Sequence, residues 1–550
     1  MPAIISAEAN SIFRNVLLTD LRLALPPSVL AAASRTTFAT DSIDAPFFPT
    51  PMKMSESSAA LWALAATFAN AIIEERFGVV QNVSVSTDAA SLFVFSSALV
   101  NVAGKQLQDP EIAKRYVIYD KGHAFDTYRR LATNIYPTKD SRFFHLHGSM
   151  NATPTLTMLG LPADRSVSED QAIEDYIATV KQYDAEWLDI ESNEHFRQAG
   201  TICLTPEEFT LSEQGKAIKD DPIYLLELKP APGLNSVPWP TTSPSSTLRP
   251  LEGIKIIEIA RVIAAPTISK LAALFGATVV RVSCLTEPDM GPLLVDGNLG
   301  KYDVSLDLKT FEGKKALDKL LEDADVLLDG YRPGALTRLG YSEAYIHEIG
   351  KRRGKGIVYI RENCYGWKGP FQHRSGWQQI SDCVTGVSWL QGRFLGLNEP
   401  VVPLLPNSDY QVGIIGLIGI FHALYHRVKT GASSTVSVSL NQFNVFYIGL
   451  GVQDDETQKS LRELHEASLS LRHFDDMHRL VRKTLTSLMK TTPKLFNPKH
   501  FCRIDANLGG PEGEKMTYLG PVANYEKTVL KYDVGSCFLN AYEAEWPHSE

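Results

Sequence analysis

Short apolar runs alternate with helical patterns through the second half of the chain. The predicted strands are 253–260, 278–282, 304–308, 325–328 and 356–360. Helices are predicted between them at 266–275 and 311–321. Strands and helices that alternate at this spacing are typical of α/β proteins with a doubly wound, mostly parallel sheet. We therefore expect ligands to bind at the carboxyl ends of these strands.

The residues at those strand ends are largely cationic. Arg261, Lys309 and the turn that holds Tyr331 and Arg332 each follow a predicted strand. No G-x-G-x-x-G follows the first strand, and no G-x-x-x-x-G-K-[ST] is present. Dinucleotide-binding and P-loop sites are therefore disfavoured, whereas the cations suit a phosphate-rich ligand of another kind.

The stretch 403–443 combines a loop, one carboxylate, a long apolar run and a strand. Asp409 stands where the loop gives way to the nearly uncharged run 412–424. Candidate caps of a helix there are Asn407, Ser408 and Asp409. At a helix start, the dipole and the free N–H groups favour an ionised carboxylate. The stretch is either a capped, buried packing helix or a nucleophilic carboxylate beside a tight substrate channel.

Two apolar runs are expected to lie in the protein core. The runs 59–73 and 412–425 are both shorter than a membrane span, so no membrane association is predicted. Gly413, Gly416 and Gly419 recur every third residue in the second run. One face of that helix carries no side chains there, so we expect another part of the structure to approach its backbone closely.

The chain contains an internal repeat. Each copy has a carboxylate, a helix, a glycine and a Val-Ser-Val-Ser strand at matching distances: Glu56, Gly78 and 83–86 in the first, Asp409, Gly431 and 436–439 in the second. A shared alternating strand is ordinary by itself, but four features in one register indicate a partial internal duplication.

Composition divides the chain into four predicted parts. Residues 1–229 form a partial first copy with a smaller α+β domain, 230–250 a Pro/Ser-rich linker, 251–450 the α/β domain, and 451–550 a helical and irregular region with a helix at 455–490. Within the first part, a strand is predicted at 143–147 and helices at 10–25, 169–183 and 206–219.

Two histidines in the first part raise the question of a metal site. His145 and His147 alternate along the predicted strand and share a face, as metal ligands can. No third ligand is close in sequence, so we expect exposed strand histidines and no metal site. The six cysteines form no C-x-x-C pair, which indicates neither a zinc site nor a disulfide framework.

Composition excludes some classes of function. Hydrophobic residues make up 44% and charged residues 21%, as in globular proteins. The net charge of −9 argues against a general nucleic-acid binder, so an anionic ligand needs local Arg and Lys side chains. Cysteines without a disulfide pattern favour a cytoplasmic protein.

Several segments of the second half together resemble CoA-transferase family III, the group that contains formyl-CoA transferase, carnitine CoA-transferase and alpha-methylacyl-CoA racemase. They are LEGIKIIEIARVIAAP at 251–266, LFGATVV at 274–280, the segment 300–309, ADVLLDGYRPGAL at 324–336, YGWKGP at 365–370, Asp409 before its helix, and KTG at 429–431. Each segment is short, but their order and spacing are specific. Residues 50–230 resemble the later region of the same family.

The resemblance implies a Rossmann-like fold and an enzyme that moves CoA between carboxylic acids. In the family, the aspartate at the position of Asp409 attacks the acyl-CoA thioester and forms a mixed anhydride. CoA and acyl-CoA are then substrates, and no tightly bound cofactor is expected. The positions expected to contact CoA are Arg261, Val262, Ile263, Lys309, Tyr331, Arg332, Arg338 and Tyr365. Family members are interlocked homodimers, so we expect an intrachain pseudo-dimer or a homodimer, with Glu56 as a relic.

The sequence departs from the family at three places. Ser283 and Cys284 stand where the family has an acidic residue and a basic residue that meets CoA. A glycine-rich loop of formyl-CoA transferase has no clear counterpart. Trp377 replaces the histidine of the racemase branch, and an indole cannot abstract an alpha proton. The alternatives to a transferase are an acyl-CoA racemase or epimerase with a different base, and a catalytically degenerate CoA-binding protein.

Overall fold

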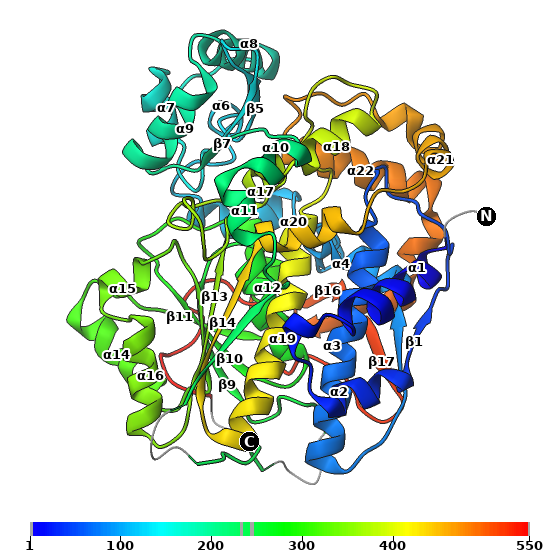
Figure 1. Ribbon diagram of the computed structural model, residues 1–550. Helices are drawn as coiled ribbons and strands as arrows, with labels where there is room; N and C mark the ends of the chain where they lie inside the picture. The colour runs from blue at the N-terminus through cyan, green and yellow to red at the C-terminus, as the bar shows by residue number, and fades with distance from the viewer. Residues whose placement is uncertain (1–3, 231–234, 242–246, 548–550) are drawn as a thin grey trace.

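A seven-stranded sheet forms the centre of the protein (Figure 1). The structure is a computed structural model that describes residues 4–230, 235–241 and 247–547, so parts of the predicted linker lie outside the described residues. In spatial order the strands are β11 (Lys301–Ser305), β10 (Thr278–Ser283), β9 (Lys255–Ala260), β12 (Val326–Gly330), β13 (Val358–Asn363), β14 (Ser433–Ser439) and β8 (Leu225–Lys229). All neighbours are parallel except β14 and β8. The predicted doubly wound sheet is confirmed, and its strand order reverses between β9 and β12, where such sheets bind ligands.

Helices cover both faces of this sheet (Figure 1). α12 (Ala264–Leu274) and α19 (Asn407–Thr430) share one hydrophobic core with alternate strand residues such as Ile360. α14 (Phe311–Leu321) and α16 (Glu343–Arg352) share a second core with the side chains that point the other way. The period-two alternation of each strand thus divides its side chains between two helical layers.

The three glycines of α19 admit close neighbours. Cβ atoms on them would lie 2.3, 2.3 and 2.5 Å from side chains of α12 and β14: Gly413 would meet Thr267, Gly416 Ile268, and Gly419 Val436. The predicted close approach is confirmed. The neighbours are side chains of a packed helix and strand, and the glycine face does not line a substrate channel.

The repeated helix, turn and strand are both present. α3 (Met54–Phe77) and α19 each contain 24 residues and end at a glycine with a left-handed φ, 66° at Gly78 and 71° at Gly431. Each helix is followed by a strand, β2 (Val83–Ser86) in the first copy and β14 in the second. The last serine of each strand then caps a further helix, α4 (Thr87–Phe93) or α20 (Leu440–Gly449).

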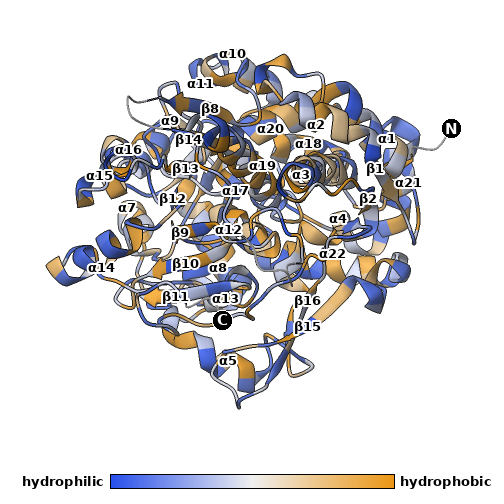
Figure 2. Cartoon of the chain, turned by 90° about the horizontal axis from the view of Figure 1, so that it is seen from below, coloured by the Kyte–Doolittle hydropathy of each residue, from blue (hydrophilic) through white to orange (hydrophobic). Residues whose placement is uncertain are grey.

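The two long helices run parallel and side by side (Figures 1 and 2). At their starts Gln411 Nε2 donates to the carbonyl oxygen of Met54, and midway the ring of Phe68 lies 5.4 Å from that of His422. By length and composition alone each helix could cross a membrane, but 100% and 89% of their most apolar windows are buried inside the protein. Their position is that of core helices.

The two copies exchange edge strands. In the first copy, β1 (Thr36–Ala39) pairs in parallel with β2, and β17 (Ala523–Tyr525) pairs with β2 in antiparallel. The second copy repeats this arrangement with β13, β14 and antiparallel β8. β8 precedes the predicted linker, whereas β17 lies near the end of the chain. Each copy is therefore completed by a strand from the other half of the sequence.

A small domain stands above the carboxyl end of the large sheet (Figure 1). It contains the antiparallel strands β5 (Asn134–Pro137), β6 (Phe143–Leu146) and β7 (Gly200–Ile202), covered by α6 (Thr127–Arg130), α7 (Thr153–Leu159), α8 (Glu169–Val180) and α9 (Ala185–Ile190). The expectation of exposed histidines is wrong: His145 and His147 are 0% and 4% exposed. They are buried because β6 is the central strand of this sheet and Trp377 stacks against His147.

Several predicted elements have different boundaries. The helix predicted at 455–490 is two helices, α21 (Asp455–His465) and α22 (Met477–Thr491), because Asp476 caps a new start. The helix predicted at 206–219 is broken at Ser212 into α10 (Pro206–Leu211) and α11 (Glu213–Ile218). The segment 10–25 contains the end of α1 (Ile5–Ser11), a π-helix over Ile12–Leu17 and a short 3-10 turn. The strand predicted at 304–308 is β11 at Lys301–Ser305. Its beginning does not read as a strand in the sequence because Lys301 and Asp303 are charged, yet both are fully buried.

Candidate active site

A cleft of about 390 Å³ lies at the switch point of the large sheet. Residues that follow β9, β12 and β13 form much of its lining, and the start of α19 contributes Asp409. The small domain supplies four more lining residues, Ser149, Met150, Asn151 and Gln198. The cleft is therefore shared between the α/β domain and the small domain.

Asp409 is the third residue of α19 and is 8% exposed, to the cleft. The predicted side-chain cap is wrong, since the helix begins after Pro406 without one, and no described residue hydrogen-bonds the Asp409 carboxylate. Burial, and then the charges of Glu362 and Asp382, raise the pKa of Asp409 well above its usual value. Desolvation and like charges thus outweigh the helix dipole that was expected to keep this group ionised.

Two further carboxyl groups lie near Asp409 and were missed in the sequence. Glu362 is the penultimate residue of β13, lines the cleft, and has its pKa raised to about 8 by burial and by the charge of Asp329. Burial also raises the pKa of Asp382 to about 7, although this carboxyl accepts hydrogen bonds from Asn444 and Gln378. A charged residue at the end of an apolar strand was the available signal for Glu362.

Three arginines gather at the exposed end of the cleft. Arg261 follows β9, donates to the carbonyl oxygen of Pro288 at 2.7 Å, and lies over the ring of Tyr331 at 5.2 Å. Arg332 follows β12 and donates to the carbonyl oxygen of Arg197 at 2.9 Å. Arg261, Arg332 and Arg338 all line the cleft, and desolvation together with the charges of Arg261 and Arg338 lowers the pKa of Arg332. Such a group favours a multiply charged anion.

The other predicted CoA-contacting residues are divided. Val262 lines the cleft, and Ile263 lines a smaller adjacent cavity with a left-handed φ of 67°, which is rare for a β-branched residue. Tyr365 is fully buried. The Lys309 side chain is 72% exposed and pairs with Glu287 at 2.8 Å, because it follows β11 at the far edge of the sheet. Neither Tyr365 nor Lys309 is among the residues that line the cleft.

Trp377 forms part of the cleft wall, next to the start of α17 (Gln378–Thr385). One face of its indole stacks on His147 at 5.0 Å, and its Nε1 donates to Ser149 Oγ at 3.3 Å. Both contacts come from the small domain. The indole is thus held in place where the racemase branch of the resembled family has a histidine.

Glu56, the counterpart of Asp409, lies in a different environment. It is 2% exposed and accepts a hydrogen bond from Gln453 Nε2 at 2.7 Å. Gln453 is itself fixed by its backbone N–H, which donates to the carbonyl oxygen of Pro51 at 2.7 Å. Burial raises the pKa of Glu56 to about 7. The segment around Gln453 therefore covers the start of α3, whereas the start of α19 at Asp409 stays open to the cleft.

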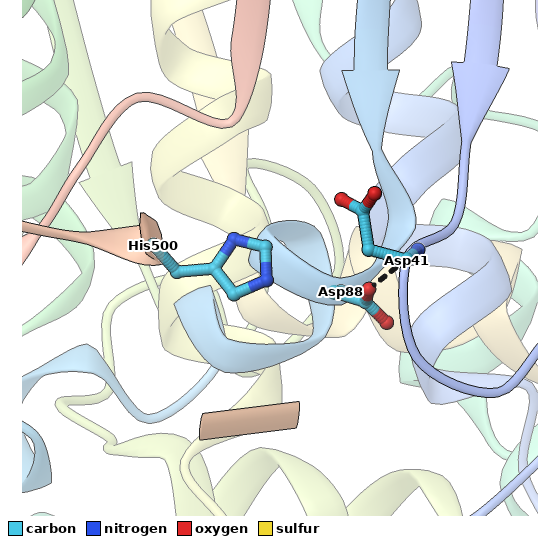
Figure 3. Close-up of side chains that lie close together, drawn as sticks. All are labelled: Asp41, Asp88 and His500. Atoms are coloured by element: carbon cyan, nitrogen blue, oxygen red, sulfur yellow. Dashed lines mark hydrogen bonds between the residues drawn. The ribbon is translucent and has the colours of Figure 1, made fainter. Parts of the chain in front are cut away.

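One cluster outside the cleft, Asp41, Asp88 and His500, has the composition of a metal site (Figure 3). Asp88 accepts hydrogen bonds from the backbone N–H groups of Asp41 and Ser42 and from the Ser42 hydroxyl. Asp41 pairs with Lys499 at 2.5 Å. Both carboxylates are thus engaged by protein groups: the contacts of Asp88 fasten residues 41–42 to the start of α4, and Asp41 pairs with Lys499.

Comparison with known proteins places this geometry in context. A family model described as CoA-transferase family III matches residues 251–468. The chain is 36% identical to an acetyl-coenzyme A transferase of Hypoxylon pulicicidum, over 98% of this chain and 93% of that protein. It is 31% identical to an acyl-CoA transferase of Gibberella moniliformis, over 88% and 86% of the two chains. A solved CAIB/BAIF family protein from Brucella suis aligns with 53% of this chain and 96% of its own at 19% identity and a TM-score of 0.37.

Proposed function

Because the chain belongs to CoA-transferase family III, we propose that it moves CoA between two carboxylic acids through a mixed anhydride on Asp409. The chain is a CoA-transferase, and CoA and acyl-CoA are its substrates.

One observation carries the choice of nucleophile. Asp409 is a carboxyl group at the buried part of a ligand-sized cleft, and no described residue uses its oxygens. A structural carboxylate in such a place would be hydrogen-bonded or paired. A nucleophile needs free oxygens that can reach the bound substrate.

The arginines support a path for CoA. We propose that its phosphates bind Arg261, Arg332 and Arg338, beside the start of α12, where the helix dipole also favours anions. The pantetheine arm then runs inward along the residues that follow β12 and β13. This places the thioester beside Asp409 and the indole of Trp377.

The first acyl donor to test is acetyl-CoA. The relative that matches almost the whole chain is named an acetyl-coenzyme A transferase, and the second is named an acyl-CoA transferase. We propose a short acyl group because Trp377 occupies part of the wall beside Asp409. A panel of acyl-CoA donors of increasing length, each with several acceptor acids, identifies the pair that this cleft accepts.

A trapping experiment tests the proposed function. The protein is incubated with an acyl-CoA and then with hydroxylamine, which converts an anhydride on a carboxyl group into a hydroxamate of that residue. Mass spectrometry should find the hydroxamate at Asp409 and nowhere else in wild type. Deuterium incorporated at the alpha carbon from heavy water, without this adduct, would support a racemase instead. Bound CoA with neither signal would support a degenerate CoA-binding protein.

A further inference from the structure

Glu362 ends a row of side chains that otherwise belongs to the core. Side chains at 358, 360, 362 and 364 share one face of β13 and its extension, and Val358, Ile360 and Cys364 all belong to the core that α19 covers. Glu362 is the position in this row where the core gives way to the cleft, so its carboxyl lies on the side of the sheet from which Asp409 approaches.

No described residue hydrogen-bonds or pairs with the Glu362 carboxyl, so it resembles Asp409 in having free oxygens. The charged and titratable groups around this part of the cleft are Asp409 of α19, Asp382 of α17, Asp329 of β12, Cys364, Glu287 and the arginines at 261, 332, 338 and 374. Those nearest to Asp409 are acidic, and no cation contributes to its pKa shift. Two unpaired carboxyl groups in one cleft favour a state in which one of them holds a proton.

We propose that Glu362 is the acid that protonates the sulfur of CoA when Asp409 attacks, and the base that removes that proton when CoA returns. This rests on the proposed function of Asp409. The Asp409 carboxylate attacks the thioester carbonyl, the C–S bond breaks, and the proton of Glu362 passes to the departing sulfur. The products are the acyl-Asp409 anhydride, the CoA thiol and the Glu362 carboxylate.

The second half of the reaction restores both groups. The acceptor carboxylate attacks the acyl-Asp409 anhydride at the aspartyl carbonyl, and the first acid leaves as a carboxylate. The sulfur of CoA then attacks the acceptor's carbonyl while Glu362 takes the thiol proton. The C–O bond to Asp409 breaks, which frees the Asp409 carboxylate and leaves Glu362 protonated. Atoms and protons balance over the cycle without a further reactant.

The neighbouring groups are less suited to this role. Asp382 does not line the cleft, and its oxygens accept hydrogen bonds from Asn444 and Gln378. Cys364 lines the cleft, but burial and the charges of Glu362, Asp382 and Asp409 raise the pKa of its thiol well above the usual value. Of these acids, Glu362 alone combines access to the cleft with a pKa, about 8, near that of a thiol.

The test compares pH profiles of acyl transfer in wild type, Glu362→Gln and the matched control Cys364→Ser. Wild type should lose activity above about pH 8, where Glu362 loses its proton. Glu362→Gln keeps a neutral hydrogen-bond donor but cannot give a proton. We expect its kcat to fall by ~10²–10⁴-fold, the usual contribution of a general acid, and the fall above pH 8 to disappear. Cys364→Ser should keep that fall, since it retains Glu362.

Two further readouts separate the possible failures. Circular dichroism and the thermal midpoint show whether Glu362→Gln is folded; if it is not, Glu362→Asp, which keeps an acid, should retain the fall at high pH. An unchanged profile in folded Glu362→Gln overturns the role of Glu362 alone, provided that wild type forms the Asp409 hydroxamate. Absence of that hydroxamate in wild type overturns the proposed function itself.

Discussion

The two copies of the repeat place a carboxyl group at the same point of the same kind of helix, yet only one of them faces a cleft. Asp409 lies opposite the diverging ends of β9 and β12, whereas the sheet of the first copy consists of β1, β2 and β17. At Glu56 there is no counterpart of the switch point, and Gln453 covers the carboxyl. A buried carboxyl at a helix start is therefore not enough to form an open site; the strand ends in front of Asp409 provide the cleft that Glu56 lacks.

The comparison predicts opposite outcomes for two matched variants. Asp409→Asn should reduce transfer by at least ~10⁴-fold, because the nucleophile is lost. Its thermal midpoint should be close to that of wild type, since the carboxylate supports no described hydrogen bond. Glu56→Gln should keep turnover within ~2-fold, because Glu56 lies outside the cleft. Initial rates of both purified variants decide this: equal losses would mean that both copies take part in the reaction.

Glu56 should instead affect how the free energy of unfolding depends on pH. Its pKa is about 7 in the folded protein against 4.5 unfolded, so the folded state binds the proton more tightly. The stability from that proton is complete below pH 4.5 and is lost as the pH rises to about 7, by up to ~3 kcal/mol. Glu56→Gln stays neutral and can still accept the Gln453 hydrogen bond. Its stability relative to wild type should therefore increase between pH 5 and 8 in denaturant titrations; a pH-independent difference would contradict this.

A third prediction concerns matched small residues in the two long helices, glycine in α19 and alanine in α3, each replaced by the other. Ala60 stands four residues after Glu56, as Gly413 stands four after Asp409. Gly413→Ala should cost ~1–3 kcal/mol, because its Cβ would meet Thr267 at 2.3 Å, and it should reduce activity by displacing the start of α19. Ala60→Gly should cost ~1 kcal/mol through helix propensity and leave activity intact. Thermal midpoints and rates measured together test the pair; a fully active Gly413→Ala would show that the α12–α19 contact does not position Asp409.

The smallest expected effect is on the Kd for CoA, and it compares two cations that follow different strands of the sheet. Arg338→Ala should raise the Kd for CoA by ~10-fold, and the loss should shrink at high salt as phosphate contacts are screened. Lys309→Ala should change the Kd by less than ~2-fold, because Lys309 is exposed and paired with Glu287. Calorimetry at low and high salt provides the comparison. Equal losses in the two variants would move the proposed phosphate site toward β11.

The sequence predicted the sheet, the repeat and the place of Asp409 at the start of a long helix, because each depends on local periodicity or on residues in a fixed register. It did not predict Glu362, since a single acid at the end of a strand is recognised as part of the cleft only once α19 is seen to pack opposite it. It failed for His145 and His147, because their burial depends on Trp377, which is more than 200 residues away in sequence. The close neighbours of the α19 glycines were expected, but their identity required the tertiary structure.

The exchanged edge strands have a consequence for how this chain acquires its structure during synthesis. β2 emerges from the ribosome long before its antiparallel neighbour β17 (Ala523–Tyr525), because more than four hundred residues separate the two strands. The first copy therefore has an unpaired strand edge beside the apolar α3 until β17 has been synthesised. Loop closure over such a span is slow, so we expect late, cooperative folding and a dependence on chaperones while translation proceeds.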